Sequence, residues 1–378
     1  MKKVSIVFFV LFSFAIGFIN AQRPEATVAR FPNETPGIRE PNVLLVDWQP
    51  QSNMVVKETY VTKPKFPVID MHNHLRRGIN PNRFPEYLKA MEETGVWMVI
   101  DLDGASANDG YKDNLASAKA TSNERFKVYF RPDFSKINEP DFGKKEAARL
   151  EDAVKNGGCR GLKYINKGTG DPYLHIDDPR VDPIWEKCAE LGIPVMMHVS
   201  DPVAFHVGPV DRTNERYDEL QTMTSFYGGA FPSKEELIEQ RNRMIAKHPN
   251  TIFIGAHVCD LAEDLGRVSM WLDTYPNYYV DISARISELG RQPVTARKFF
   301  IQYQDRIVFG TDTAPNVEAY RIYYRFLETD DEYFDPTPAH KLQGRWMIYG
   351  INLPDDVLEK VYNKNAIKIM GMFKGGAY

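Results

Sequence analysis

The sequence has few cysteines, no excess of basic charge and no phosphate-binding glycine motif, and each absence excludes a class of protein. Three cysteines among 378 residues, Cys159, Cys188 and Cys259, are too few and too scattered for a disulfide-stapled scaffold or a thiolate zinc site. A net charge of −4 and a pI near 6.1 give no basic surface for nucleic acid. With 43% hydrophobic and 26% charged residues, the composition is that of an ordinary globular protein.

The first 21 residues have the order of segments that is typical of a secretory signal peptide. Lys2 and Lys3 precede an apolar run that ends at Ile19, and the small residue Ala21 follows. An uncleaved anchor helix is the alternative, but Pro24 and its polar neighbours end the run without a stop-transfer pattern. We therefore expect cleavage after Ala21, export to the periplasm or the extracellular space, and no membrane association afterwards.

Residues 22–65 are rich in proline and polar side chains, which break both helical and strand periodicity. This segment is predicted to be an extended arm that wraps around the body or reaches a neighbouring subunit in a homodimer. The remaining chain, residues 66–372, is predicted to be a single catalytic domain.

Eight short apolar segments alternate with helical patterns along this domain. Their number, and a length of roughly 250 residues, match a (β/α)₈ TIM barrel; a doubly wound sheet is the alternative, but it rarely needs eight such units and the sequence has no GxGxxG turn. The predicted strands are Val68–Met71, Val96–Asp101, Phe126–Arg131, Cys159–Ile165, Pro194–His198, Thr251–His257, Tyr278–Ile282 and Arg306–Asp312. The clearest predicted helices between them are Phe84–Thr94, Asn114–Ser122, Lys144–Asn156, Pro183–Leu191, Lys234–Lys247, Leu261–Tyr275 and Val294–Tyr303.

Metal-binding residue types stand at the ends of four of these strands. His72 and His74 are one residue apart, so a strand directs both imidazoles to one side. His198, His257 and Asp312 end later strands, and all strand ends of a TIM barrel face one mouth. Imidazole and carboxylate are suitable ligands for zinc, so the pattern predicts a metal site in that mouth.

Four further side chains are candidates for binding substrate. Lys163 lies on the fourth strand, Arg285 follows the seventh and Arg76 follows the first, and each cation is suited to a carboxylate. His206 lies in the long connection 201–231, which together with 166–180 is expected to cover the mouth and select the substrate.

The ordered set of motifs resembles the amidohydrolase superfamily, in particular the amidohydrolase-related group (amidohydrolase 2) that includes aminocarboxymuconate semialdehyde decarboxylase-like enzymes. The resemblance extends from about Phe66 to Met372. It depends on the DMHNH segment with Asp70, on GIPVMMH, PNTIFIGAH, YYVDIS and FGTD, and on the closing segment Lys364-Asn365-Ala366.

This resemblance implies one divalent ion, zinc in most members, held by His72, His74, His198 and Asp312, with a water molecule in an open position. Asp312 would also accept the proton of that water, and His257 would polarise a substrate oxygen or donate a proton. Other branches of the superfamily place a carboxylated lysine between two metals at the position of Lys163. The alternative, an unmodified lysine that binds a substrate carboxylate, is preferred here because a charged lysine in the mouth needs a partner.

The sequence departs from the family pattern in two places. Val258-Cys259-Asp260 follows His257, where the family often has a turn that contains glycine, and Pro315 comes one residue late after Asp312. The ligand types are nevertheless intact.

Three functions are compatible with these residues. The first, which we expect because export favours the cleavage of small degradative substrates, is a hydrolase that acts on a lactone, ester or amide of a small carboxylated substrate. The second, the alternative, is a non-oxidative decarboxylase on the same scaffold; the ligand residues do not discriminate between the two. The third is a barrel used only for binding, which is disfavoured because converging imidazoles and carboxylates are costly to keep unpaired.

Overall fold

The computed structural model describes residue 44 and residues 52–75, 83–104, 110–122, 124–169, 173–338 and 343–371. The chain divides into two units, Met1–Met54 and Val55–Tyr378. The predicted signal peptide lies outside the described residues, as does most of the predicted arm. Within residues 55–65, the described part of the arm in the second unit, there is no helix or strand, and the amide of Thr59 donates to Asp331 Oδ2 at 2.6 Å.

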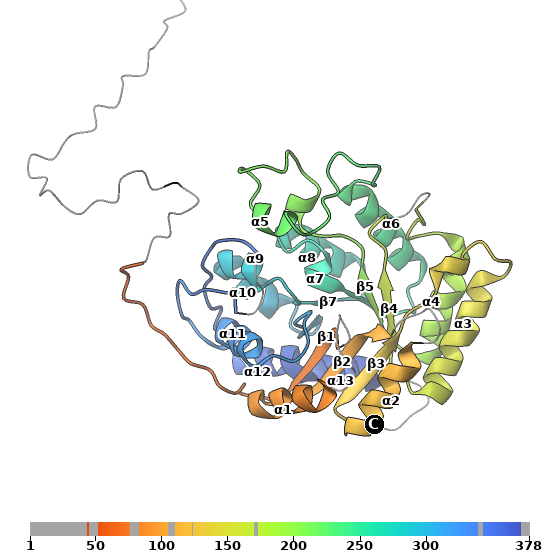
Figure 1. Cartoon of the computed structure of the whole chain (residues 1–378), viewed down its shortest axis with the longest axis horizontal. Helices are drawn as coiled ribbons and strands as arrows, with labels where there is room; N and C mark the ends of the chain where they lie inside the picture. Colours follow the sequence, from red (N-terminus) through yellow and green to blue (C-terminus); the bar gives the residue numbers. More distant parts are fainter. Residues whose placement is uncertain are drawn as a thin grey trace, which may run out of the picture. The chain divides into compact units, whose positions relative to one another are not determined.

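Eight parallel strands form one sheet in chain order, and this confirms the predicted TIM barrel (Figure 1). Hydrogen bonds from Met71 N to Phe309 O and from Asp312 N to His72 O join the first strand to the segment after the last one. The strands are β1 (Val68–Asn73), β2 (Val96–Gly104), β3 (Phe126–Phe130), β4 (Leu162–Ile165), β5 (Val195–His198), β6 (Phe253–Gly255), β7 (Tyr278–Asp281) and β8 (Ile307–Val308).

Helices surround the barrel and lie between successive strands (Figure 1). The longer ones are α1 (Phe84–Thr94), α2 (Tyr111–Ser122), α3 (Phe142–Asp152), α4 (Asp182–Leu191), α6 (Lys234–Lys247), α8 (Leu265–Thr274), α10 (Pro293–Gln302), α11 (Val317–Glu328) and α13 (Asn365–Gly371). Short elements are α5 (Tyr217–Leu220), α7 (Ala256–Cys259), α9 (Ile286–Arg291) and α12 (Asp355–Glu359), the π-helical turns η4 (Ala153–Gly157) and η7 (Lys360–Lys364), and the 3₁₀ turns η3 (Phe134–Lys136), η5 (Pro179–Val181) and η6 (Val203–Phe205). No helix in the described part of the chain is long and apolar enough to cross a membrane.

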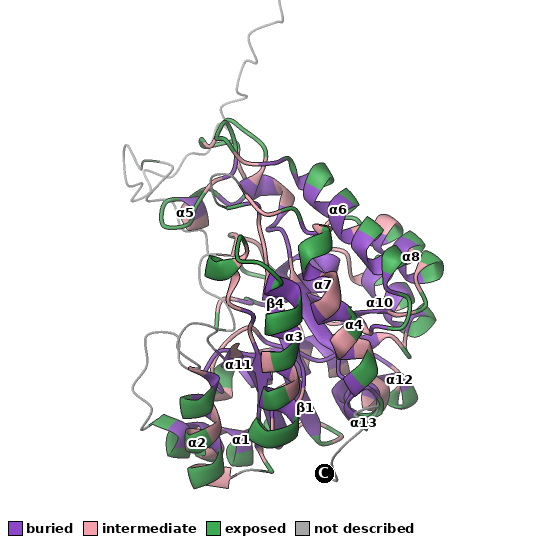
Figure 2. Cartoon of the chain, turned by 90° about the vertical axis from the view of Figure 1, so that its right-hand side faces the viewer, coloured by how far each residue is buried: buried purple, intermediate pink, exposed green. Residues whose placement is uncertain are grey.

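The strands bury both faces because their side chains alternate between two apolar clusters. Ile69, Met98 and Ile254 belong to a cluster that includes Ile369 and Met370 of α13, whereas their chain neighbours pack against the surrounding helices. In Figure 2 the strands are buried, and the exposed residues lie mainly on the helices and loops around them.

The observed ends of helices agree with the predicted ends where the sequence contains a capping residue. α1 ends at Gly95, which has a φ of 75° and needs the freedom of glycine, and α6 begins after Ser233, whose side chain accepts the amide of Glu236. Both helices have the predicted bounds. The last strand is shorter than predicted: β8 ends at Val308, so Asp312 lies in the loop that follows.

Candidate metal centre

His72 and His74 present their Nε2 atoms to a common point because carboxylates hold the opposite ring nitrogens. His72 Nδ1 lies 2.7 Å from Asp281 Oδ2, and His74 Nδ1 lies 2.6 Å from Asp103 Oδ1. An ionised carboxylate can only accept a hydrogen bond, so each Nδ1 carries the proton and each Nε2 keeps a lone pair. This is the arrangement that orients histidine ligands in metal sites.

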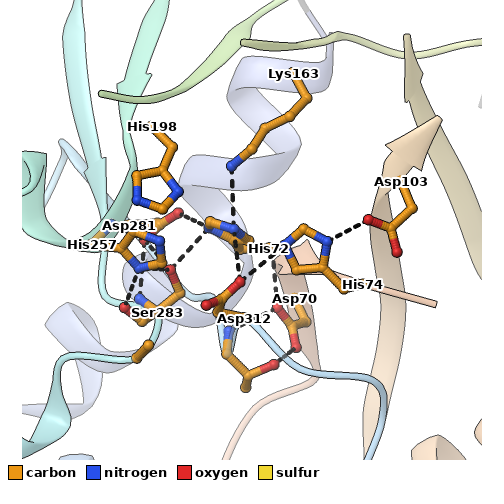
Figure 3. A network of polar contacts seen from close by, with 12 residues as sticks. Asp70, His72, His74, Asp103, Lys163, His198, His257, Asp281, Ser283 and Asp312 are labelled. Carbon is orange, nitrogen blue, oxygen red and sulfur yellow. Dashed lines mark hydrogen bonds and ion pairs between the residues drawn. The ribbon is translucent and has the colours of Figure 1, made fainter. Parts of the chain in front are cut away.

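Asp312 completes a group of three potential ligands (Figure 3). Its Oδ1 lies 2.9 Å from His74 Nε2 and 3.3 Å from His72 Nε2, and the ligand atoms of all three residues lie within 4.8 Å of one another. Burial raises the pKa of Asp312, but the adjacent imidazoles of His72 and His74 outweigh this effect and hold the pKa well below its usual value. The structure therefore brings together three of the four predicted metal ligands.

His198, the fourth predicted ligand, is outside this group. It ends β5, and its ring centroid lies 4.4 Å from that of His257. Its buried Nε2 makes no hydrogen bond, although Asp201 Oδ1 lies 3.5 Å away and Asp260 Oδ1 lies 3.9 Å away. Burial, together with the charge of Lys167, lowers the pKa of His198 to about 3, so the ring is neutral at neutral pH. Its role as a ligand stays a prediction.

The donor set fits a divalent metal ion. Two imidazole Nε2 atoms and one carboxylate converge, and a neutral imidazole with an unsatisfied buried nitrogen stands nearby. A buried polar atom without a partner is costly, and coordination to a cation would remove that cost.

His257 is fixed by two contacts, one with the last residue of β7 and one with the segment that follows this strand. Its amide donates to Asp281 Oδ1 at 2.9 Å, and its Nδ1 donates to the carbonyl of Ser283 at 2.8 Å, so its Nε2 is left with a lone pair. Burial, followed by the proximity of His198 and Arg285, lowers the pKa of His257 well below its usual value. The imidazole is therefore neutral, and its Nε2 carries a lone pair and no proton.

His257 was predicted to end the sixth strand, but β6 stops at Gly255. A left-handed turn follows, in which His257, Val258, Cys259 and Asp260 have φ between 56° and 58°. This conformation costs roughly 1–2 kcal/mol for each residue other than glycine, and it is a rare outlier for a β-branched residue such as Val258. The turn occupies the place where the family often has a turn with glycine.

His72, His257 and Asp281 form a second group whose potential ligand atoms lie within 4.8 Å. The oxygens of Asp281 are already engaged, since Oδ2 accepts from His72 and Oδ1 accepts from the amides of His257 and Ser283 and from the Ser283 hydroxyl. This group is therefore a hydrogen-bonding centre that orients two imidazoles.

Asp70 and Gly310 connect β1 with the loop that carries Asp312. Asp70 accepts hydrogen bonds from the hydroxyls of Thr311 and Tyr320 at 2.6 Å and 3.0 Å. A Cβ atom on Gly310 would lie only 2.9 Å from His72 Cβ, so glycine at this position allows the two segments to approach closely.

Two buried cations lie near this centre, Lys163 beside His72 and Arg285 close enough to His257 to lower its pKa. Lys163 Nζ lies 3.3 Å from His72 Nε2, and burial lowers its pKa to about 8. Arg285 is 6% exposed, and its NH1 donates to Ala284 O at 2.5 Å. Among the described residues, no carboxylate lies within 4.0 Å of the Arg285 guanidinium.

The remaining predicted substrate contacts are not placed at this centre. His206 is half-buried and stacks on Phe226 with centroids 4.8 Å apart, and its Nε2 lies 3.0 Å from Ser200 Oγ. It thus contacts its own loop. Arg76 lies outside the described residues.

Several site residues were not identified from the sequence. Asp281 was visible in the YYVDIS motif but was given no role, and Asp103, Ser283 and Asp260 were not considered. Their position at the ends of β2, β6 and β7 was the available signal, since strand ends of a TIM barrel face the active site.

Comparison with known proteins supports the fold and assigns the family. The amidohydrolase family profile matches residues 69–372. The solved structure of 2,6-dihydroxybenzoate decarboxylase from Rhizobium is similar, with a TM-score of 0.52, 17% sequence identity, and coverage of 81% of this chain and 99% of that one. A dihydroxybenzoic acid decarboxylase from Polaromonas, solved with manganese and 2-nitroresorcinol, has a TM-score of 0.52 and 16% sequence identity, and the match covers 82% of this chain and 98% of that one. For 5-carboxyvanillate decarboxylase from Sphingomonas paucimobilis the TM-score is 0.50 and the identity 15%, and the match covers 81% of this chain and 99% of that one. No protein of curated function matches the sequence.

The fold and the family profile define a TIM-barrel enzyme that depends on a divalent metal ion. The chain belongs to the amidohydrolase family.

Proposed function

We propose that this enzyme is a metal-dependent, non-oxidative decarboxylase that acts on a small carboxylated substrate. The observation that carries the proposal is Arg285, a buried guanidinium beside His257 that has no ion-pair partner among the described residues. Although burial lowers the pKa of Arg285, the charges of Glu288 and Glu263 outweigh this effect, so the guanidinium stays charged and can bind a ligand that supplies a negative charge. Among similar folds, those of 2,6-dihydroxybenzoate and 5-carboxyvanillate decarboxylases support this choice of substrate class.

The side chains can divide the reaction between binding and proton transfer. Arg285 binds an anionic group of the substrate, and Lys163 adds a second cation near the candidate ligands. When bound, a divalent ion held by His72, His74, Asp312 and the predicted ligand His198 supplies Lewis-acid polarisation of substrate oxygens. We propose zinc as this ion.

His257 moves the proton. The carbon that loses carbon dioxide must gain a proton, and the neutral Nε2 of His257 has none to give at the start. It first accepts a proton, for instance from a hydroxyl group of the substrate, and then returns that proton to the carbon. The bond between Nδ1 and Ser283 O keeps the ring in the orientation and tautomer that this requires.

Hydrolysis of a lactone, ester or amide is the second candidate. The same neutral Nε2 of His257 is suited to accept a proton from water, and Asp312 is a second acceptor at the site. Arg285 would then bind a carboxylate that does not react.

One panel of assays separates these candidates. Purified protein loaded with zinc or manganese is offered hydroxybenzoates, lactones, esters and amides, and carbon dioxide release and hydrolysis are measured in parallel. We expect carbon dioxide from a hydroxybenzoate and a loss of at least tenfold in kcat/KM for Arg285→Met. Arg243→Met is the matched control, because Arg243 is 57% exposed and pairs with Asp177. Hydrolysis without decarboxylation would replace the first function with the second.

We also propose that the enzyme is exported, on the basis of the amino-terminal sequence alone. Cell fractionation and amino-terminal sequencing test this, with Gln22 expected as the first residue of the mature chain. A full-length chain in the cytoplasmic fraction would contradict it.

A further inference from the structure

The left-handed turn after β6 needs an external cause. Four consecutive residues, His257–Asp260, have positive φ, and none of them is glycine. Such backbone strain persists only where the surrounding structure imposes it. The contacts of the turn therefore show what holds His257 in place.

Lys234, the first residue of α6, binds one end of this turn. Its side chain is buried, and its Nζ donates to Asp260 O at 2.5 Å, to Asp201 O at 2.5 Å and to Ser200 Oγ at 3.1 Å. Ser200 and Asp201 follow His198, whereas Asp260 follows His257. One ammonium group thus joins the two loops that carry the active-site imidazoles.

Arg241, which lies in the same helix as Lys234, binds the carbonyl of Cys259, the residue before Asp260 in the turn. It lies two helical turns after Lys234, on the same face of α6. Its NH1 donates to Cys259 O at 2.7 Å, and its guanidinium carbon lies 4.3 Å from the ring centroid of Trp271. The aromatic contact fixes the guanidinium, so α6 holds two consecutive carbonyl groups of the turn.

The left-handed turn determines the positions of His198 and His257. Asp260 Oδ2 accepts a hydrogen bond at 3.3 Å from the amide of Val199, the residue immediately after His198. The other oxygen, Asp260 Oδ1, lies 3.9 Å from His198 Nε2. The other end of the turn places the His257 ring against that of His198. A relaxed turn would move Asp260 and His257 together.

We propose that Lys234 and Arg241 are positioning residues, through which α6 imposes the left-handed turn and thereby aligns His257 and His198. The kinetic consequence rests on the proposed function, whereas the conformational consequence does not. Neither cation needs to touch substrate for this role.

Hydrogen–deuterium exchange of the metal-loaded enzyme tests the conformational part. Lys234→Met keeps the length of the side chain but removes all three donated bonds. We expect amides 258–261 to exchange at least tenfold faster than in the wild type, with the metal content unchanged. Lys247→Met, at the exposed opposite end of α6 where Lys247 pairs with Asp182, is the control and should leave this exchange unchanged.

The kinetic part uses the decarboxylation assay. Lys234→Met should lower kcat at least tenfold and leave KM within about twofold, because the change alters the alignment of His257 and not the binding of substrate. Lys234→Gln, which keeps one donor, should give an intermediate effect on both readouts and replaces the Met variant if that variant does not fold.

Unchanged exchange of amides 258–261 in both Lys234 variants would overturn the inference, whatever the activity. If the wild type decarboxylates none of the carboxylates offered, the proposed function fails, and the exchange result still decides whether α6 imposes the turn. An equal rise in exchange over the whole of α6 and the turn would show general destabilisation and would also overturn it.

Discussion

Asp281 Oδ2 lies 2.7 Å from Nδ1 of His72, although 209 residues separate the two in the sequence. The same carboxylate accepts the backbone amide of His257 through its other oxygen. One buried aspartate therefore orients a candidate metal ligand and the candidate proton acceptor together. Two predictions concern this arrangement.

Asp281→Asn should reduce metal affinity about 10- to 100-fold, because asparagine has one acceptor oxygen where aspartate uses both. Competition with a chelator, followed by elemental analysis, measures this effect. Asp305→Asn is the control, since Asp305 is 63% exposed and pairs with Lys360 on the surface. Equal affinities in the wild type and Asp281→Asn would show that His72 does not depend on Asp281.

His72→Ala should abolish the metal content of about one ion per chain, because it removes a ligand from the group of His72, His74 and Asp312. Elemental analysis of the purified wild type and variant is sufficient. Equal metal content in the two proteins would refute this assignment of the site.

Gly310→Ala should destabilise the fold by about 1–3 kcal/mol, because the new methyl group would lie 2.9 Å from His72 Cβ and force β1 and the loop after β8 apart. Urea denaturation measures the change. Gly266→Ala lies in the first turn of α8, where the nearest atom is a movable carboxylate oxygen of Asp264, and should be tolerated. Equal stabilities of the two variants would argue against close packing at Gly310.

The sequence was sufficient for the architecture because burial on both faces makes each barrel strand a short apolar run, as in Val195–His198. It was also sufficient for the convergence of His72, His74 and Asp312, since barrel topology brings all strand ends to one mouth. Helices with clear caps, such as α1 and α6, had the predicted bounds.

The local geometry could not be predicted in the same way. Val258 disfavours the left-handed conformation that it adopts, and the cause lies in Lys234 and Arg241 on another element. Likewise, the residue type of Asp281 does not indicate that its carboxylate accepts hydrogen bonds from His72, His257 and Ser283. Tertiary contacts decide such features, and a single sequence does not record them.

Lys234 should also make stability depend on pH. Burial lowers its pKa from 10.5 to about 8, so between these values the unfolded chain holds the proton more tightly than the folded one. Folding then releases a proton, and the contribution of Lys234 to stability rises as the pH rises from about 8. Relative to Lys234→Met, the wild type should gain about 1 kcal/mol per pH unit between pH 8 and pH 10.

Urea denaturation of both proteins at pH 7, 8, 9 and 10 checks this value, and the comparison cancels the other titrating groups. A difference in stability that stays constant over this range would mean that the ammonium group is not destabilised by burial.

The last prediction concerns Lys163, which we expect to remain an unmodified amine that binds an anionic group of the substrate. A second metal bridged by carboxylated Lys163 would need His198 and His257 as ligands. The Nδ1 of His257 is already bonded to Ser283 O, and coordination through Nε2 would remove its only proton acceptor. One metal ion leaves that acceptor free. Lys163→Met should therefore raise KM about tenfold and leave the metal content at about one ion per chain, with or without bicarbonate during reconstitution. Two ions per chain in the wild type, reduced in the variant and dependent on bicarbonate, would instead establish the bridged site.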